Sequence, residues 1–301
     1  MNILQTKNVV KRYTNHTALN NVSISVPKGS IYGLLGPNGA GKTSLIRIIT
    51  QITGADSGEV LIHGEPLMPK HTEDIGYMPE ERGLYRKMKV GEQLIYLARL
   101  KGMKQSEARL KIKEWLKRLD IDGWWNKNVE DLSKGMQQKV QFISTVLHHP
   151  QLLILDEPFS GLDPVNENII RDEILALRKQ GSTVIFSTHR METVEELCDD
   201  IALINKSQKI LEGKKKEIKE QHKTNTFLME TDREIMQVSN QFNLIECNPN
   251  ENGNFVSKIK MLAGTNNELL AEVMQNANVV SFSEEFPSMH DIFIQLVTEK
   301  K

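Results

Sequence analysis

The sequence predicts an α/β fold built on parallel strands and followed by a smaller α+β domain, and three observations indicate it. First, the apolar run Ile31–Leu35 leads into a glycine-rich loop and then into a helical stretch over 42–51. Second, the apolar runs 151–158 and 182–189 both end in polar side chains, as buried parallel strands do where their ends carry a site. Third, short strand and helix patterns alternate after residue 225.

The loop after Leu35 fits the phosphate-binding pattern G-x-x-x-x-G-K-[ST], with a strand before it and a helix after it. Glycines allow successive amide N–H groups to point inward, and the following helix presents the positive end of its dipole to the same anion. We expect Lys42 to reach the β- and γ-phosphates of a triphosphate and the Thr43 hydroxyl to bind Mg²⁺. The alternative is a glycine-rich turn with a surface lysine. The expected binding residues are Gly36, Asn38, Gly39, Ala40, Gly41, Lys42, Thr43 and Ser44.

Composition excludes several classes of protein. The 301 residues include 38 basic and 39 acidic side chains, a formal net charge of −1, so the basic excess of a general nucleic-acid or membrane-surface binder is missing. Cys198 and Cys247 lie far apart without metal-ligand spacing, which favours a reducing cytosolic setting. The N-terminus lacks a signal-peptide pattern, and no run reaches the ~18 apolar residues of a membrane span. We therefore expect any role at a membrane to depend on a partner.

Residues 2–35 alternate apolar and polar positions and predict three short strands before the loop. Tyr13 in this stretch is either ordinary strand packing or a platform for a purine ring, and the nearby phosphate-binding loop favours the platform. A strand is predicted over 57–64. A shorter strand that begins at Ile75 ends in a proline and a charged cluster starting at Glu80.

Helical spacing of apolar residues predicts two amphipathic helices, over 90–101 and 105–119, whose apolar faces pack against the protein. Another helix opens at Ser133, which has the chemistry of an N-cap. Capping and binding are compatible at this position, because a capped helix N-terminus is also an anion site.

The apolar run 151–158 ends in two carboxylates, Asp156 and Glu157. Asp156 fits the acid that organises Mg²⁺ in phosphate-loop ATPases, and Glu157 is placed to orient and polarise the water that attacks the γ-phosphate. The alternative is a solvated loop start, which the four apolar residues before the acids disfavour. After a turn and a helix over 165–179, the next buried strand ends at His189, which places this histidine beside the nucleotide site.

By this order of features, about residues 1–215 resemble the ATP-binding subunit of ABC transporters. The resemblance implies a P-loop NTPase fold of ABC type, with a mixed sheet, an antiparallel subdomain and a helical subdomain. The matching elements are Tyr13 as the adenine-stacking aromatic, Gly36–Thr43 as Walker A, Leu132–Met136 as the signature LSGGQ, Leu152–Glu157 as Walker B with its catalytic glutamate, Ser160–Asp163 as the D-loop, and His189 as the switch histidine.

The resemblance implies a sandwich dimer in which Ser133 and Gly135 of one subunit contact the γ-phosphate held by Lys42 of the other, with Asp163 of the D-loop at the same site. It also implies ATP with Mg²⁺ held by Thr43, Asp156 and Glu80, and hydrolysis that depends on Glu157, His189 and Lys42. The partners would be an integral membrane permease and a second ATP-binding subunit, the same or different, with no nucleic acid. The expected location is cytoplasmic, on the inner face of the cell membrane.

The sequence departs from the family pattern at two sites. Glu80 stands where the family has a glutamine that touches Mg²⁺ and the lytic water; a carboxylate still offers an oxygen ligand but adds charge. Lys134 and Met136 replace a glycine and a glutamine of the signature, whose serine and second glycine remain. The stretch 80–85 resembles ATPases of bacterial sodium-efflux and drug-efflux exporters, so export is the expected direction.

The second predicted domain spans 216–301, after an ATP-binding domain over 1–215. The lysine-rich stretch 206–223 at the junction predicts a solvated linker helix, with a lipid-headgroup contact as the alternative. The expected elements beyond it are strand 226–231, helix 232–241, strands 244–249 and 254–262, helix 266–276, strand 278–284 and helix 288–299. The first six have the β-α-β-β-α-β order of a ferredoxin-like unit, without chemistry of their own, and predict an accessory domain for dimer contact or regulation.

Two other functions compete with a transport motor. One is a soluble ABC ATPase not linked to transport, although the chain lacks both the long coiled-coil insertions of repair members and the second ATPase unit of ribosomal ones. The other is a GTP-binding switch protein, because Asn205-Lys206-Ser207-Gln208 approaches the guanine-reading NKxD motif. Gln208 replaces its aspartate, and the signature and His189 also argue against that class.

Overall fold

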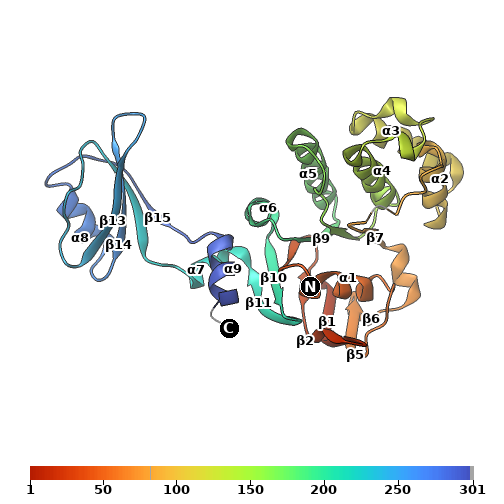
Figure 1. Ribbon diagram of the computed structural model, residues 1–301, viewed down its shortest axis with the longest axis horizontal. Helices are drawn as coiled ribbons and strands as arrows, with labels where there is room; N and C mark the ends of the chain where they lie inside the picture. Colours follow the sequence, from red (N-terminus) through yellow and green to blue (C-terminus); the bar gives the residue numbers. More distant parts are fainter. Residues whose placement is uncertain (82, 299–301) are drawn as a thin grey trace. The chain divides into compact units, whose positions relative to one another are not determined.

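The computed structural model describes residues 1–81 and 83–298. Arg82, part of the efflux-type stretch 80–85, lies outside the described residues, as do residues 299–301 at the end of the predicted final helix and second domain. The chain divides into two compact units, Met1–Lys215 and Lys216–Lys301 (Figure 1).

The first unit is organised around a six-stranded sheet with the strand order β11-β10-β4-β9-β8-β7. All neighbours are parallel except β10 and β11, and every residue of β4, β8 and β9 is buried. Strands covered on both faces read as continuous apolar runs, which is why they are visible in the sequence. The strands are β4 (Ile31–Leu35), β7 (Ile75–Met78), β8 (Leu152–Asp156), β9 (Thr183–Thr188), β10 (Asp200–Asn205) and β11 (Gln208–Lys214).

A second, antiparallel sheet has the order β2-β1-β5-β6, with β3 also paired to β1. Three strands are predicted over 2–35, but the structure has four, β1 to β4. The chain turns at Asn21, where φ is 55°, so that β3 is separate from β2. Helix α1 (Lys42–Ile49) shares one buried apolar cluster with both sheets. The strands are β1 (Asn2–Tyr13), β2 (His16–Val22), β3 (Ser25–Pro27), β5 (Ser57–Ile62) and β6 (Glu65–Pro66).

Helices α2 (Val90–Leu100), α3 (Gln105–Arg118) and α4 (Lys134–Val146) pack together as a helical subdomain (Figure 1). Trp115 and Phe142 meet edge to face in it, with ring centroids 5.9 Å apart. Short 3₁₀ turns occur at Pro69–Glu73, Asp122–Trp124 and Val129–Asp131. Helices α5 (Pro164–Lys179) and α6 (Met191–Leu197) lie before and after β9 in the chain.

The lysine-rich stretch is not a linker helix over its first half, so that prediction is wrong there. Asn205 pairs with Gln208, and the two residues between them have positive φ, 45° at Lys206 and 68° at Ser207. Two such residues form the tight turn that joins antiparallel strands, so the segment up to Lys214 belongs to β11. Only α7 (Lys215–Gln221) is helical. The four residues that approached the NKxD motif are therefore this hairpin turn.

The second unit contains a four-stranded antiparallel sheet with the order β13-β14-β12-β15. Its core includes Met229, Ile259 and Leu269, all fully buried. Thr265 and Glu268 form a reciprocal capping box that starts α8. The elements are β12 (Thr226–Thr231), β13 (Phe242–Pro249), β14 (Phe255–Met261), α8 (Asn266–Val273), β15 (Val279–Glu285) and α9 (Met289–Thr298).

The helix predicted over 232–241 is absent from the described structure, and this prediction is wrong. Ile235 is buried and Val238 packs against the same core, so the segment packs as irregular chain against the core of the second unit. The backbone N–H and hydroxyl of Ser239 both donate to the carboxylate of Glu272, at 2.5 and 2.7 Å, which fixes the end of the segment to α8. The ferredoxin-like order therefore lacks its first helix.

Candidate nucleotide site

The phosphate-binding loop has a backbone that requires glycine at two positions. Gly36 and Gly41 have φ of 145° and 114°, and an added Cβ would lie 2.0 Å from the Ile204 carbonyl oxygen and 2.3 Å from that of Ala18, respectively. Gly41 is also the N-cap of α1. Among the described residues, no side chain caps this end of the helix, and the first turn contains no acidic residue. The first N–H groups of α1 therefore stay available to an anion.

Lys42 lies at the centre of the loop and is buried, with 7% of its surface exposed. Its Nζ donates to the carbonyl oxygens of Gly36 at 2.7 Å and Pro37 at 3.2 Å. Burial lowers the pKa of Lys42, while the nearby carboxylates of Glu157, Asp156 and Glu80 act in the opposite direction. Three carboxylates therefore lie close enough to the Lys42 ammonium to stabilise its positive charge.

A cavity of about 240 Å³ opens at the loop. It joins four parts of the chain that are distant in sequence: β2, the loop with the start of α1, the segment after β7, and the end of β8. It is lined by His16, Ala18, Asn38, Gly39, Gly41, Lys42, Thr43, Ser44, Glu80, Asp156 and Glu157. His16 and Ala18, from β2, line the cavity but were not predicted from the sequence. Gly36 and Ala40 were predicted to bind and belong to the same loop, but they are not among the lining residues.

Asp156 is the buried acid of the site, 2% exposed at the end of β8. Its Oδ2 accepts a hydrogen bond from Thr43 Oγ1 at 3.2 Å, and its Oδ1 accepts one from the hydroxyl of Ser187. Ser187 lies directly opposite Asp156 in the parallel pairing of β8 and β9. Ser187 was not predicted from the sequence, where it stands beside Thr188 as one of two adjacent hydroxyls at the end of a buried strand.

The donor set fits a hard divalent cation. Thr43, Asp156 and Glu80 present one hydroxyl and two carboxylates to the same cavity, and Mg²⁺ prefers oxygen ligands. Among the described residues there is no group of three His, Cys, Asp or Glu side chains arranged to enclose a metal. Mg²⁺ commonly binds through one or two carboxylates and keeps waters or substrate phosphates as its other ligands, so these three residues suit it.

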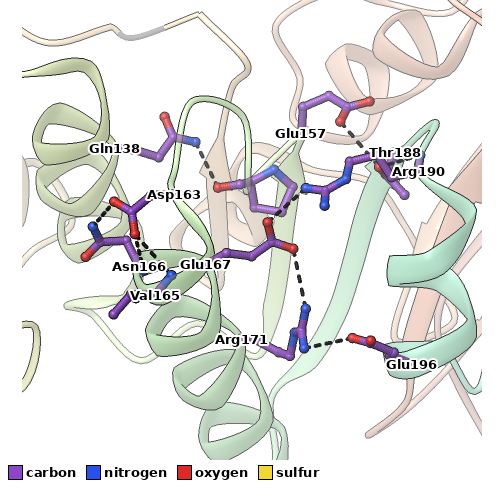
Figure 2. Close-up of polar contacts among 11 residues, drawn as sticks. Gln138, Glu157, Asp163, Val165, Asn166, Glu167, Arg171, Thr188, Arg190 and Glu196 are labelled. Atoms are coloured by element: carbon purple, nitrogen blue, oxygen red, sulfur yellow. Dashed lines mark hydrogen bonds and ion pairs between the residues drawn. The ribbon is translucent and has the colours of Figure 1, made fainter.

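Glu157, which follows β8, has a left-handed backbone with φ 49°. Such a conformation in a non-glycine residue is strained and is often found at functional positions. Glu157 Oε1 lies 2.8 Å from His189 Nδ1. Its Oε2 accepts from Thr188 Oγ1 at 3.3 Å (Figure 2). The end of β9 therefore holds the carboxylate at two points. The His189 side chain is 59% exposed and stands next to the acid as expected from the sequence.

Tyr13 lies at the turn between β1 and β2, where it pairs with His16. The two rings stack with centroids 5.5 Å apart and an interplanar angle of 25°, and Lys11 Nζ lies 5.6 Å from the centre of the tyrosine ring. Tyr13 is 42% exposed. His16, and not Tyr13, is among the residues that line the cavity, so a flat ligand would meet the pair from the histidine side.

Ser133, Gly135 and Asp163 are brought together in a different place, a cavity of about 600 Å³ separate from the one at the loop. Ser133 caps α4 by accepting from Met136 N at 3.3 Å. Asp163 caps α5 by accepting from the backbone N–H groups of Val165 and Asn166, both at 3.0 Å, and these bonds with the Asn166 side chain lower the pKa of Asp163 (Figure 2). Within one chain, these residues do not reach the phosphate-binding loop.

Two glutamines of α4 bind the loops that carry the acids. Gln138 Nε2 donates to the carbonyl of Pro158, the residue after Glu157, at 3.0 Å, and Gln141 Nε2 donates to the carbonyl of Pro79, the residue before Glu80, at 2.9 Å. Both side chains are buried. These two glutamines were not predicted from the sequence, although polar residues on the buried face of an amphipathic helix are a signal in themselves.

A phosphate-binding loop, a buried aspartate at the end of a parallel strand and an adjacent glutamate define the chain as a phosphate-loop ATPase. It belongs to the ABC transporter family as an ATP-binding subunit: the family model described as ABC transporter matches residues 19–160. A second model, the C-terminal domain of ATP-binding proteins like DrrA1-3, matches residues 213–297. The predicted family and fold class are confirmed by these matches.

The chain is similar to several known proteins over most of its length. It is 40% identical over 298 residues to YhaQ, an uncharacterized ABC transporter ATP-binding protein of Bacillus subtilis, which covers 98% of each chain. It is 34% identical over 219 residues to Nod factor export ATP-binding protein I of Cupriavidus metallidurans, or 72% of each chain. A solved structure of an ABC transporter ATP-binding subunit superposes with a TM-score of 0.68 at 28% identity, over 73% of this chain and 92% of that one.

Within the described part of the chain, none of the helices has the length and apolar character to cross a membrane.

Proposed function

We propose that this chain is the motor subunit of an exporter, which hydrolyses ATP with Mg²⁺ and drives a separate integral membrane permease. The observation that carries the proposal is the single cavity lined by Lys42, Asp156, Glu157 and Glu80, which combines a phosphate-binding loop with acids for a cation and a water. Its place in the cell would be cytoplasmic, on the inner face of the membrane and attached through the permease.

In this proposal, the loop amides and Lys42 bind the phosphates. The carbonyl bonds that Lys42 now makes to Gly36 and Pro37 hold its ammonium near the position that a phosphate would occupy. His16 and Tyr13 form the stacking surface for the adenine ring. Binding by fixed amides and one buried lysine places the γ-phosphate against Glu157 before any reaction starts.

Glu157 orients the attacking water and polarises it, and His189 contacts the γ-phosphate. Thr188 and His189 hold the two carboxylate oxygens of Glu157, which fixes the direction of the acid. Thr43, Asp156 and Glu80 would hold Mg²⁺, which supplies positive charge to the phosphate oxygens when bound. Ser187 keeps Asp156 oriented toward that position.

A second ATP-binding subunit completes the site, either a copy of this chain or a related one. Ser133, Gly135 and Asp163 share a cavity of their own, away from the loop of the same chain, which suits residues that act on the nucleotide of a partner. Capping of α4 by Ser133 directs the N-terminus of that helix into the cavity, where it would meet an anion.

Export is favoured by the similarity to a Nod factor export protein. A soluble ABC ATPase unconnected with transport is the competing function.

To separate the transport motor from the soluble ATPase, tagged Glu157→Gln would be purified from detergent-solubilised native membranes with ATP and Mg²⁺, and its partners identified by mass spectrometry. Lys42→Ala is the control, because it keeps the surface but loses the phosphate contact. Recovery of a polytopic membrane protein supports the proposal, and recovery of soluble proteins alone would overturn it.

A further inference from the structure

The residue after His189 connects the nucleotide site to α5. Arg190 Nη1 lies 3.0 Å from Glu167 Oε2, and Glu167 is on the first turn of α5, four residues after its cap Asp163 (Figure 2). Glu167 is buried, with 8% of its surface exposed, whereas the Arg190 side chain is 44% exposed. An ion pair with one buried member is held in place more strongly than a surface pair, because the buried charge needs its partner.

The opposite end of the same short segment is attached to Glu157. Arg190 N donates to Thr188 Oγ1 at 3.0 Å, and that hydroxyl donates to Glu157 Oε2 at 3.3 Å. The segment 188–190 is therefore fixed to a carboxylate at each end, Glu157 in the site and Glu167 in α5. His189 lies between the two attachments, and its exposed ring depends on the position of this backbone.

Glu167 has a second partner that offers an internal control. Arg171 Nη2 lies 3.4 Å from Glu167 Oε1, and Arg171 Nη1 lies 2.8 Å from Glu196 Oε2 of α6 (Figure 2). Both arginines pair with the same carboxylate, but only Arg190 belongs to the segment that carries His189. Loss of Arg171 would remove a charge partner of Glu167 without releasing that segment.

We propose that Glu167 and Arg190 are positioning residues for ATP hydrolysis: their ion pair fixes segment 188–190 to α5 and so sets where His189 and Thr188 meet Glu157. The inference rests on the proposed roles of Glu157 and His189. The N-cap of α5 is Asp163, which we place at the partner's nucleotide. The Glu167–Arg190 ion pair therefore also couples the position of His189 to the dimer contact. Neither residue touches the nucleotide in this scheme.

The test uses the full-length chain in complex with the partners recovered from membranes. Glu167→Gln and Arg190→Gln keep side-chain size and remove the charge pair, and Arg190→Lys keeps a positive charge on a shorter, single-point group. We expect kcat for ATP to fall by about tenfold in the two glutamine variants, with KM within about twofold of wild type, because a displaced catalytic group costs rate and leaves binding intact. Arg190→Lys should recover part of the loss, and Arg171→Gln should stay within about twofold of wild type in kcat.

A cycle with His189→Ala separates positioning from general stability. If the pair acts through His189, adding Glu167→Gln to His189→Ala should lower kcat by less than about twofold further, because the two changes remove one effect. A full tenfold further loss, an equal loss in Arg171→Gln, or an unchanged kcat in either Glu167→Gln or Arg190→Gln would overturn the positioning role. If Glu167→Gln fails to fold, the half-exposed Arg190→Gln carries the same cycle.

The proposed function can fail separately. If His189→Ala keeps wild-type kcat, the role of His189 is wrong and the positioning role with it. If His189→Ala is slow while Arg190→Gln is normal, the role of His189 stands and the positioning role is wrong.

Discussion

Replacing Gly36 by alanine tests how the phosphate-binding loop is held against the central sheet. The φ of 145° at Gly36 is costly for any side chain, by about 1–3 kcal/mol. The new Cβ would also lie 2.0 Å from the carbonyl oxygen of Ile204, a backbone atom of β10 that cannot rotate away. Forcing it in should cost about 1–3 kcal/mol more, since the loop or the strand must shift. We expect a total loss of about 2–6 kcal/mol of unfolding free energy.

Gly39→Ala is the matched control within the same loop. Gly39 has φ 78°, but nothing lies within 4 Å of an added Cβ, so this variant has the conformational cost without the collision. We expect Gly39→Ala to lose about 1–2 kcal/mol, the usual cost of a left-handed residue. The difference between the two variants therefore contains the contact with Ile204 together with the difference in conformational cost between φ 145° and φ 78°.

Urea titration followed by tryptophan fluorescence measures both variants. All three tryptophans, Trp115, Trp124 and Trp125, lie in the unit Met1–Lys215, so the signal reports on the unit that contains the loop. A difference of about 2 kcal/mol moves the midpoint by about 1 M urea for an ordinary denaturant slope. Equal midpoints for Gly36→Ala and Gly39→Ala would refute the reasoning, because the collision would then have no effect.

Three further changes test other parts of the structure. Ser187→Ala removes a donor from the buried carboxylate of Asp156 and should lower the unfolding free energy by about 1–3 kcal/mol in the same titration; a change within the error of the method would contradict this. Burial lowers the pKa of His148 to about 4, below its unfolded value near 6.5, so its contribution to stability is present above pH ~6.5 and is lost as the pH falls toward 4. Unfolding midpoints between pH 7 and 4 should therefore fall less steeply in His148→Gln, and an identical slope would refute the assignment. Leu269→Ala should destabilise the second unit by about 2–5 kcal/mol, which would be measured as faster amide exchange in β12 and β14. The urea midpoint from tryptophan fluorescence should stay the same. Faster exchange in the first unit as well would contradict the independent stability of the two units.

Much of the candidate site could be predicted from the sequence because each of its residues has chemistry that only a few side chains provide. Lys42, Asp156 and Glu157 stand at the ends of elements whose buried strands are continuous apolar runs, and parallel strands bring such ends to one edge. Their roles in binding and hydrolysis stay predictions. His16 and Ser187 were not predicted, since a histidine at the start of a strand and a serine near the end of one carry no specific signal until the neighbouring segments are known.

The elements that were predicted wrongly show where tertiary contacts decide. The segment 232–241 has residues that favour a helix, but burial of Ile235 and the bonds from Ser239 to Glu272 stabilise an irregular path instead. The lysine-rich stretch 206–223 was predicted as a solvated helix, but pairing with β10 and a two-residue turn make its first half a strand, and only α7 is helical. In the first case the partner is distant in sequence, and in the second it is the preceding strand β10; in both, pairing with another segment decides the conformation, and the propensity of the segment alone cannot include that partner.

The most direct test of the account is the rate of ATP hydrolysis by Glu157→Gln in the complex recovered from membranes, compared with wild type under saturating ATP and Mg²⁺. Glutamine keeps the shape of Glu157 and its contacts with Thr188 and His189 but is a far weaker base. We predict a rate lower by about 10²–10⁴-fold, the usual contribution of a positioned general base, with ATP still bound. Turnover near the wild-type rate would contradict the assignment of Glu157 and with it the proposed mechanism.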